Sequence, residues 1–215
     1  MQIIILKTKE RNTTDFFKTA LKNITITEER KFLLKHIAEK IAQEYQEKEQ
    51  VNLNFICTHN SRRSQLGQVW GFFAAEYFEL KNISSFSGGT EITAFFRNTV
   101  ATLKNVGFSF DIVDFSHQNP KYLISFEGSK KSIIGFSKLY NYSDNDKPFI
   151  AITTCDSADE NCPFIPEALA RFHLPFVDPK HSDGKENQAE TYLKTNQQIA
   201  GEVYLIFKKV KELLS

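Results

Sequence analysis

The 215-residue sequence has few cysteines, almost no net charge and no long apolar run. A formal net charge of +1 argues against nucleic acid or a membrane surface as the main partner, because both attract strongly basic proteins. No run approaches the roughly 20 apolar residues of a membrane-spanning helix, and the apolar run at residues 1–7 is too short for a secretory signal. The expected location is the cytoplasm, where three cysteines indicate reactive thiols rather than a disulfide framework.

One stretch, residues 52–67, has the pattern of a reactive site. The apolar residues before Cys57 predict a strand that ends at this cysteine, and Ser64–Phe78 predicts a helix. A loop from strand to helix points backbone N–H groups, and the positive end of the helix dipole, at one concave site. We therefore expect an oxyanion held by the loop and by the fork of Arg63, with the Cys57 thiolate as nucleophile.

The C-x5-R-S pattern from Cys57 to Ser64 resembles the loop of low-molecular-weight protein tyrosine phosphatases. Two later stretches, Thr153–Pro163 and Val177–Pro179, make the sequence more similar to the thioredoxin-coupled arsenate reductases of the same superfamily. The likeness runs from Asn52 to the C-terminus, apart from one insertion. It implies a doubly wound α/β fold with a four-stranded parallel sheet, the second strand at an edge beside the first. The site would lie at the carboxyl end of the first strand.

Other patterns along the chain agree with alternating strands and helices. Lys121–Phe136 alternates on both sides of a turn at Glu127, which predicts a β-hairpin. Because the family usually carries less sequence here, residues 121–140 are interpreted as an insertion that would extend the sheet edge. The remaining expected elements are a strand at Ile83–Gly89, a helix at Phe95–Val106 closed by Gly107, a strand at Pro148–Thr154 and a closing helix at Thr195–Leu214.

Residues 1–50 precede the phosphatase-like domain, which we place at 51–215, and are expected to form a helical extension. Asp15–Leu21 predicts a short helix, and a capping box at Thr25–Glu28 predicts the start of a longer one. Apolar residues from Phe32 to Tyr45 follow at near-helical spacing. Two interpretations remain open: a helix packed on the domain surface, or a lid or dimer contact.

Several residues of the loop have expected roles. Asn60 suits a left-handed backbone position, Ser64 could donate to the Cys57 sulfur, and Arg62 is expected to be solvated. The loop departs from the family at His59, where glycine is common, and at Arg62, where many members have a second cysteine. The implied catalytic residues are Cys57, Arg63, Ser64, Cys155, Cys162 and Asp178, and the implied substrate-binding residues are Thr58, His59, Asn60, Ser61, Arg62 and Arg63.

Cys155 and Cys162 form a C-x6-C pair with no histidine nearby, which is a poor metal site, and no metal or other cofactor is expected. Their acidic surroundings predict an exposed loop. On a helix the pair would lie about 10.5 Å apart, beyond the roughly 7 Å that a disulfide allows, so residues 156–161 would have to be looped. The resemblance implies that Cys57 attacks arsenate, Cys155 attacks Cys57 and releases arsenite, and Cys162 takes over the disulfide for reduction by thioredoxin. Two incidental buried thiols remain the alternative.

Asp178, followed by a proline, resembles the general-acid position of the family, where an acid protonates the leaving oxygen. An Asx-type turn is the alternative, and Asp183 is a second candidate for the acid. We read His173 and His181 as ordinary surface or packing residues.

The sequence therefore favours reduction of arsenate to arsenite. The alternative is a phosphatase that hydrolyses phosphotyrosine or small phosphomonoesters through a phosphocysteine, because phosphate and arsenate are nearly isosteric. A non-catalytic module that binds oxyanions is a third interpretation, from a different functional class.

Overall fold

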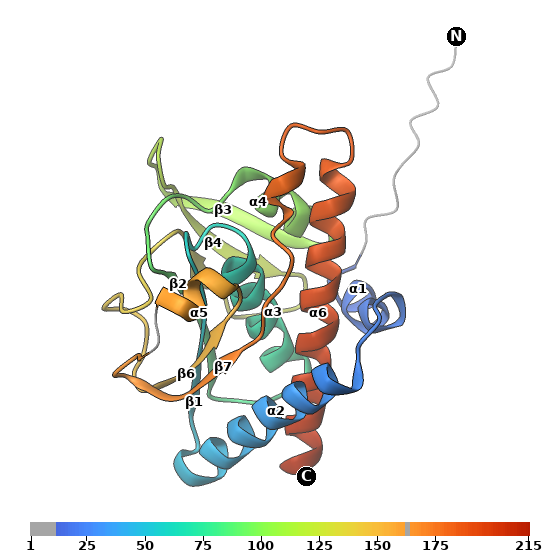
Figure 1. Ribbon diagram of the computed structural model, residues 1–215, viewed down its shortest axis with the longest axis vertical. Coiled ribbons are helices and arrows are strands. Elements are labelled where there is room, and N and C mark those ends of the chain that lie inside the picture. Colours follow the sequence, from blue (N-terminus) through green and yellow to red (C-terminus); the bar gives the residue numbers. More distant parts are fainter. Residues whose placement is uncertain (1–11, 162–163) are drawn as a thin grey trace.

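The computed structural model describes residues 12–161 and 164–215 (Figure 1). Cys162, one of the expected redox thiols, lies outside the described residues. A four-stranded parallel sheet with the order β2-β1-β6-β7 forms the centre of the fold. Its strands are β1 (Val51–Cys57), β2 (Ile83–Gly89), β6 (Phe149–Thr153) and β7 (Ala168–His173). The predicted α/β fold is confirmed, including the edge position of the second strand; the last strand, β7, has no counterpart in the sequence analysis.

The two central strands are buried on both faces, as is usual for parallel strands covered on both sides. Successive side chains of a strand point to opposite faces. Leu53 of β1 and Ile150 of β6 therefore belong to the main core, whereas Ile56 and Phe149 belong to a smaller cluster that includes Ala158. The main core lies on the side of the long helices, and the smaller cluster lies beneath the short helix α5 (Asp156–Asn161).

The N-terminal helices pack against the C-terminal helix. They are α1 (Thr13–Ala20), the 3-10 turn η1 (Leu21–Asn23) and α2 (Glu28–Lys48), and α2 crosses one half of α6 (Gln188–Leu213) in Figure 1. Phe17 of α1 stacks at 5.4 Å on the indole of Trp70. This packing agrees with the interpretation of helices packed on the surface of the domain. The domain boundary between residues 50 and 51 stays a prediction.

The start of α2 differs from its predicted position. Thr27, rather than Thr25, is the N-cap, and its side chain accepts a hydrogen bond of 3.2 Å from the Arg30 backbone N–H. A capping box needs Glu or Gln three residues after the cap, and position 30 is an arginine. Arg30 instead pairs with buried Glu202 of α6 at 2.8 Å, which ties the first turn of α2 to α6.

A second sheet, antiparallel, has the order β3-β4-β5. Its strands are β3 (Phe108–Asp114), β4 (Lys121–Phe126) and β5 (Ile133–Gly135). The predicted hairpin is therefore present, but the expectation that it extends the parallel sheet is wrong. It pairs with β3, which the sequence analysis did not foresee, and the segment after the hairpin reaches β2 through an isolated bridge between Gly89 and Leu139.

The remaining helices are α3 (Arg63–Tyr77), α4 (Arg97–Asn105) and the 3-10 turn η2 (Pro179–Ser182). Helices α3 and α4 match the predicted ones, whereas α6 begins at Gln188 rather than Thr195. Among residues 12–161 and 164–215, no helix combines the length and the apolar character needed to cross a membrane.

Candidate active site

Cys57, the expected nucleophile, lies where β1 meets the loop that leads into α3. The Cys57 Sγ lies 3.0 Å from the Oγ of Ser64, and the Nδ2 of Asn60 donates to the same Oγ at 2.8 Å. Because Ser64 accepts from Asn60, its own hydrogen can be donated to the sulfur, where it stabilises a thiolate. Asn60 has φ 45°, which confirms the left-handed backbone position expected of it.

The backbone carbonyl oxygens of residues 57–61 each accept a hydrogen bond from a residue outside positions 57–61. In contrast, no backbone N–H of residues 58–64 donates to another residue in the described part of the chain. A peptide unit points its N–H opposite to its carbonyl, so these N–H groups face the inside of the loop and can bind an anion. The outer donors are Thr90 N to Cys57 O (3.3 Å), Glu91 N to Thr58 O (2.8 Å), Ser137 Oγ to His59 O (2.8 Å), Gln65 Nε2 to Asn60 O (3.0 Å) and Phe96 N to Ser61 O (3.1 Å).

Gly89, at the end of β2, packs directly against this loop. A Cβ at this position would lie 2.6 Å from the Thr58 carbonyl oxygen and 2.9 Å from the Asn60 N. Both distances are shorter than a carbon can approach backbone atoms without displacing them. The loop therefore owes part of its shape to the absence of a side chain at the end of the neighbouring strand.

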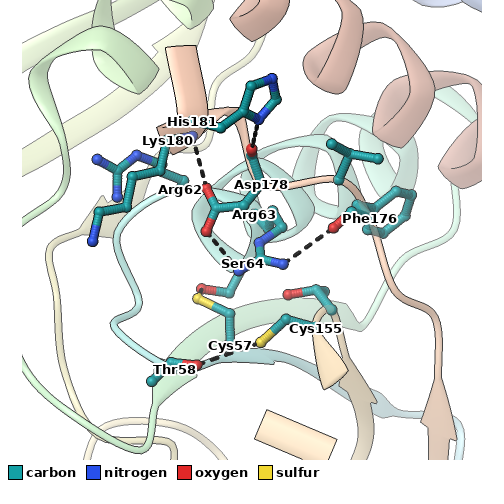
Figure 2. A network of polar contacts seen from close by, with 12 residues as sticks. Cys57, Thr58, Arg62, Arg63, Ser64, Cys155, Phe176, Asp178, Lys180 and His181 are labelled. Carbon is teal, nitrogen blue, oxygen red and sulfur yellow. Dashed lines mark hydrogen bonds and ion pairs between the residues drawn. The ribbon is translucent and has the colours of Figure 1, made fainter. Parts of the chain in front are cut away.

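Arg63 and Asp178, the expected clamp and the expected acid, lie together on the side of the loop toward which the Cys57 sulfur points (Figure 2). The Nη2 of Arg63 donates to the Oδ2 of Asp178 at 2.7 Å, and its Nη1 donates to the carbonyl oxygen of Phe176 at 3.1 Å. The other carboxylate oxygen of Asp178 accepts from the backbone N–H of Lys180 at 3.0 Å. The Asx-type turn weighed from the sequence is thus present together with the ion pair.

Arg62 is not solvated, and the expectation that it would be is wrong: its side chain is only 11% exposed. Its Nε donates to the hydroxyl of Tyr192 and its Nη2 to the Oδ2 of Asp183, both at 2.7 Å. The guanidinium also lies 4.0 Å from the ring centre of Phe96. The side chain is therefore directed away from the inside of the loop and is fully engaged with α6 and the segment after η2.

The charges in this group explain two shifted pKa values. Burial lowers the pKa of Arg62, but the hydrogen bond to Tyr192 and the nearby carboxylates outweigh it, so the pKa is raised. Burial and the hydrogen bond to Asp183 raise the pKa of Tyr192 to about 12. Asp183 accepts from Arg62 and Tyr192, whose side chains are directed away from the inside of the loop, whereas Asp178 accepts from Arg63 on the side toward which the Cys57 sulfur points.

Cys155 follows β6 and reaches the same edge of the sheet as Cys57, as predicted. Its backbone neighbour Thr154 donates to the Ile56 carbonyl at 2.7 Å, and its Sγ lies 3.6 Å from the Oγ1 of Thr58 (Figure 2). The expected exposed loop is wrong at this point, since Cys155 is only 3% exposed. The residues that follow it form α5, a helix rather than a loop.

His173, at the end of β7, has a larger role than the sequence suggested. Its Nε2 lies 3.0 Å from the Oδ1 of Asp156 and its Nδ1 lies 3.4 Å from the Oδ1 of Asp159, so it joins β7 to the first turn of α5. Arg171 of the same strand also pairs with Asp159 and donates to its carbonyl oxygen at 2.6 Å. No sequence motif marks these contacts, because they join residues of separate elements.

Two further features do not bear on the inside of the loop. The side chain of His59, a loop residue, pairs with Glu91 at 3.3 Å on the surface. A hollow of about 1190 Å³ between α4, β3, β4 and α6 includes no residue of the Cys57 loop. The described part of the chain contains no group of three or more His, Cys, Asp or Glu side chains placed to hold a metal ion.

Comparison with known proteins identifies the family. An arsenate reductase from Brevibacillus brevis is 32% identical over 135 residues, which are 62% of this chain and 81% of that protein. The arsenate reductase of Bacillus subtilis is 29% identical over 134 residues, which are 62% of this chain and 78% of that protein. The crystal structure of a low-molecular-weight protein tyrosine phosphatase from T. tengcongensis is similar with a TM-score of 0.48 and 15% identity, over 74% of this chain and 99% of that one. No family model matches the chain. With a relative that is 32% identical over most of its length, the chain belongs to the arsenate reductase family.

Proposed function

We propose that this protein reduces arsenate to arsenite with Cys57 as the nucleophile. The orientation of the Cys57 loop carries the proposal: its carbonyl oxygens are bound from outside, while the N–H groups of residues 58–64 donate to no other described residue. Together with the N-terminal end of α3, these groups favour a tetrahedral oxyanion above the sulfur. The relatives, whose names state arsenate reductase, support arsenate as that oxyanion.

In the first step the Cys57 thiolate attacks the arsenic atom. A sulfur–arsenic bond forms, an arsenic–oxygen bond breaks, and the leaving hydroxyl takes a proton from Asp178 and departs as water. Arg63, whose Nη2 lies 2.7 Å from Asp178, would exchange this partner for the oxyanion and neutralise its charge. Arsenic remains pentavalent after this step.

In the second step the Cys155 thiolate attacks the Sγ of Cys57. A disulfide bond forms, the sulfur–arsenic bond breaks, and its electron pair stays on arsenic, which leaves as trivalent arsenite. The parallel pairing of β1 with β6 supports this step, because it brings both cysteines to one edge of the sheet. The contact of 3.6 Å between Thr58 Oγ1 and Cys155 Sγ supports it as well.

In the third step Cys162 attacks the Sγ of Cys155 and releases the Cys57 thiolate. Helical geometry separates residues seven positions apart by about 10.5 Å, and a disulfide allows roughly 7 Å between Cα atoms. The described residues 156–161 form the helix α5, so the proposal includes an unwinding of this segment as the bond closes. A dithiol reductant of the thioredoxin class would then reduce this disulfide by thiol–disulfide exchange.

A phosphatase is the second candidate. Asp178, which lies beside Arg63, would protonate the alkoxide that leaves a phosphate ester just as it would protonate the hydroxyl that leaves arsenate. In that reaction water would hydrolyse the phosphocysteine, and neither Cys155 nor Cys162 would be needed. The two functions therefore differ in their dependence on the second and third cysteines.

One set of assays separates the candidates. Arsenate-dependent oxidation of NADPH is measured with thioredoxin and thioredoxin reductase, and hydrolysis of para-nitrophenyl phosphate is measured in parallel. We expect Cys57→Ser to abolish both activities, whereas Cys155→Ser and Cys162→Ser abolish reduction alone. Fast hydrolysis without arsenate turnover would favour the phosphatase. A protein that binds arsenate but turns over neither substrate would be the non-catalytic module.

A further inference from the structure

We infer that Arg62 is a positioning residue, which holds the segment carrying Asp178 over Cys57 through Asp183 and Tyr192. The inference rests on the proposed function in one respect, namely that Asp178 is the proton donor. Arg62 itself does not face the oxyanion site, because its guanidinium is bound to Tyr192 and Asp183 and stacks on Phe96.

Two neighbouring arginines of the Cys57 loop bind two carboxylates of one short segment. Arg63 pairs with Asp178 and Arg62 pairs with Asp183, each at 2.7 Å. Between the two carboxylates lies the 3-10 turn η2 (Pro179–Ser182). The segment is thus attached to the loop at both of its ends.

The turn between the two aspartates is rigid enough to connect their positions. Asp178 caps its beginning through Lys180 N at 3.0 Å, and the backbone N–H of Asp183 closes its end on the Lys180 carbonyl, also at 3.0 Å. Inside the turn, the buried hydroxyl of Ser182 donates to the Pro179 carbonyl at 2.7 Å. Fixing Asp183 therefore limits where the Asp178 carboxylate can lie.

Only one of the two attachments can persist through the reaction. Arg63 must bind the oxyanion, so its pair with Asp178 is weakened when substrate arrives. Arg62 keeps its partners, because Asp183 is held a second time by the Tyr192 hydroxyl at 2.7 Å and the Tyr192 ring stacks on that of Phe96 at 6.2 Å. The Arg62 attachment is thus the one that keeps Asp178 near the leaving oxygen in the loaded enzyme.

The test uses Asp183→Asn and Tyr192→Phe, which preserve side-chain shape, with Glu186→Gln as the matched control. Glu186 is an exposed carboxylate three residues after Asp183. Loss of one charge-assisted hydrogen bond corresponds to roughly a tenfold change in an equilibrium. We therefore expect amide hydrogen exchange at residues 178–184 to rise about tenfold in both variants and to stay unchanged in the control.

The activity readout separates positioning from binding. In the two variants we expect kcat for arsenate to fall about tenfold while KM changes less than about twofold, because Arg63 and the loop N–H groups still bind the oxyanion. Arg62→Lys, which keeps the charge but not the fork, should lose less kcat than Arg62→Ala. Circular dichroism checks that each variant is folded.

The outcomes distinguish this inference from the proposed function. If the wild type turns over neither arsenate nor phosphate esters, the proposed function fails, and the hydrogen-exchange comparison still decides whether Arg62 anchors the segment. Unchanged exchange and unchanged kcat in Asp183→Asn and Tyr192→Phe would overturn the inference. So would a rise in KM with unchanged kcat, since that would assign the group to substrate binding.

Discussion

Substituting Gly89 by alanine should damage the oxyanion site without a direct contact to substrate. The added Cβ would lie 2.6 Å from the Thr58 carbonyl oxygen and 2.9 Å from the Asn60 N, whereas ordinary contacts need about 3.4 Å or more. The loop must therefore shift by roughly 0.5–0.8 Å, and overpacking of this kind costs about 1–3 kcal/mol. The loop N–H groups would then no longer point toward one anion position.

Gly128→Ala is the matched control. Gly128 has φ 86° and nothing within 4 Å of an added Cβ, so alanine there meets backbone strain but no neighbour. A left-handed residue costs roughly 1–2 kcal/mol, which is similar to the expected cost at Gly89. The two variants should therefore have comparable stability in urea unfolding and differ in activity.

The assay is affinity for arsenate and for inorganic phosphate, measured by calorimetry and by protection of Cys57 against iodoacetamide. For Gly89→Ala we expect affinity to fall about 10–100-fold, since misaligning several charge-assisted hydrogen bonds costs roughly 1.5–3 kcal/mol. Gly128→Ala should bind like the wild type. If Gly89→Ala retains wild-type affinity, the shape of the loop does not depend on this contact and the reasoning is refuted.

Three further predictions concern charge and packing. Arg63→Lys should reduce kcat/KM for arsenate at least about tenfold, because an ammonium cannot replace the fork of the guanidinium; steady-state kinetics with a folded variant checks this. Phe17→Ala, which removes a fully buried ring stacked on Trp70, should lower the free energy of unfolding by about 3–5 kcal/mol, as measured in urea. Burial lowers the pKa of Lys138 from 10.5 to about 8. The unfolded chain therefore binds more protons between these two values, so the contribution of Lys138 to stability should rise as pH increases from about 8 to about 10.5. Lys138→Met should remove that rise in pH-dependent urea unfolding.

The sequence was sufficient for the parts of the site that depend on local order. Cys57, Ser64 and Asn60 lie close together in sequence, and the strand before them and the helix after them determine where the connecting loop begins and ends. The strand at Ile83–Gly89 was found with its bounds, because a compact segment ending in glycines has few other interpretations. In local motifs of this kind, the spacing of the residues is enough to predict their geometry.

Contacts between distant segments were not predictable in the same way. Arg62 lies next to Arg63 in sequence, yet its partners Asp183 and Tyr192 are brought to it only by the packing of α6. A charged residue in a loop is usually solvated, and nothing local distinguishes this one. His173 is similar, since its acidic partners belong to another element.

The second sheet shows the same limit for secondary structure. The alternation at Lys121–Phe136 predicts a hairpin, but not which strand it joins. Its partner β3 (Phe108–Asp114) has several exposed residues and a weak pattern, so only tertiary pairing identifies it. The inserted hairpin forms a separate sheet with β3 and does not extend the parallel sheet. The segment after β5 contacts the edge strand β2 instead.

The central claim is that Cys57 attacks arsenate and that the two electrons that reduce arsenic come from the thiols, leaving a disulfide that ends between Cys155 and Cys162. The most direct measurement is a single turnover, in which fully reduced protein is mixed with excess arsenate in the absence of any external thiol. The account predicts one arsenite released per chain and two thiols lost, with Cys155 and Cys162 linked in the product identified by mass spectrometry. Cys155→Ser should release no arsenite. Release of arsenite by Cys155→Ser at the wild-type rate, or loss of no thiols in the wild type, would contradict the account.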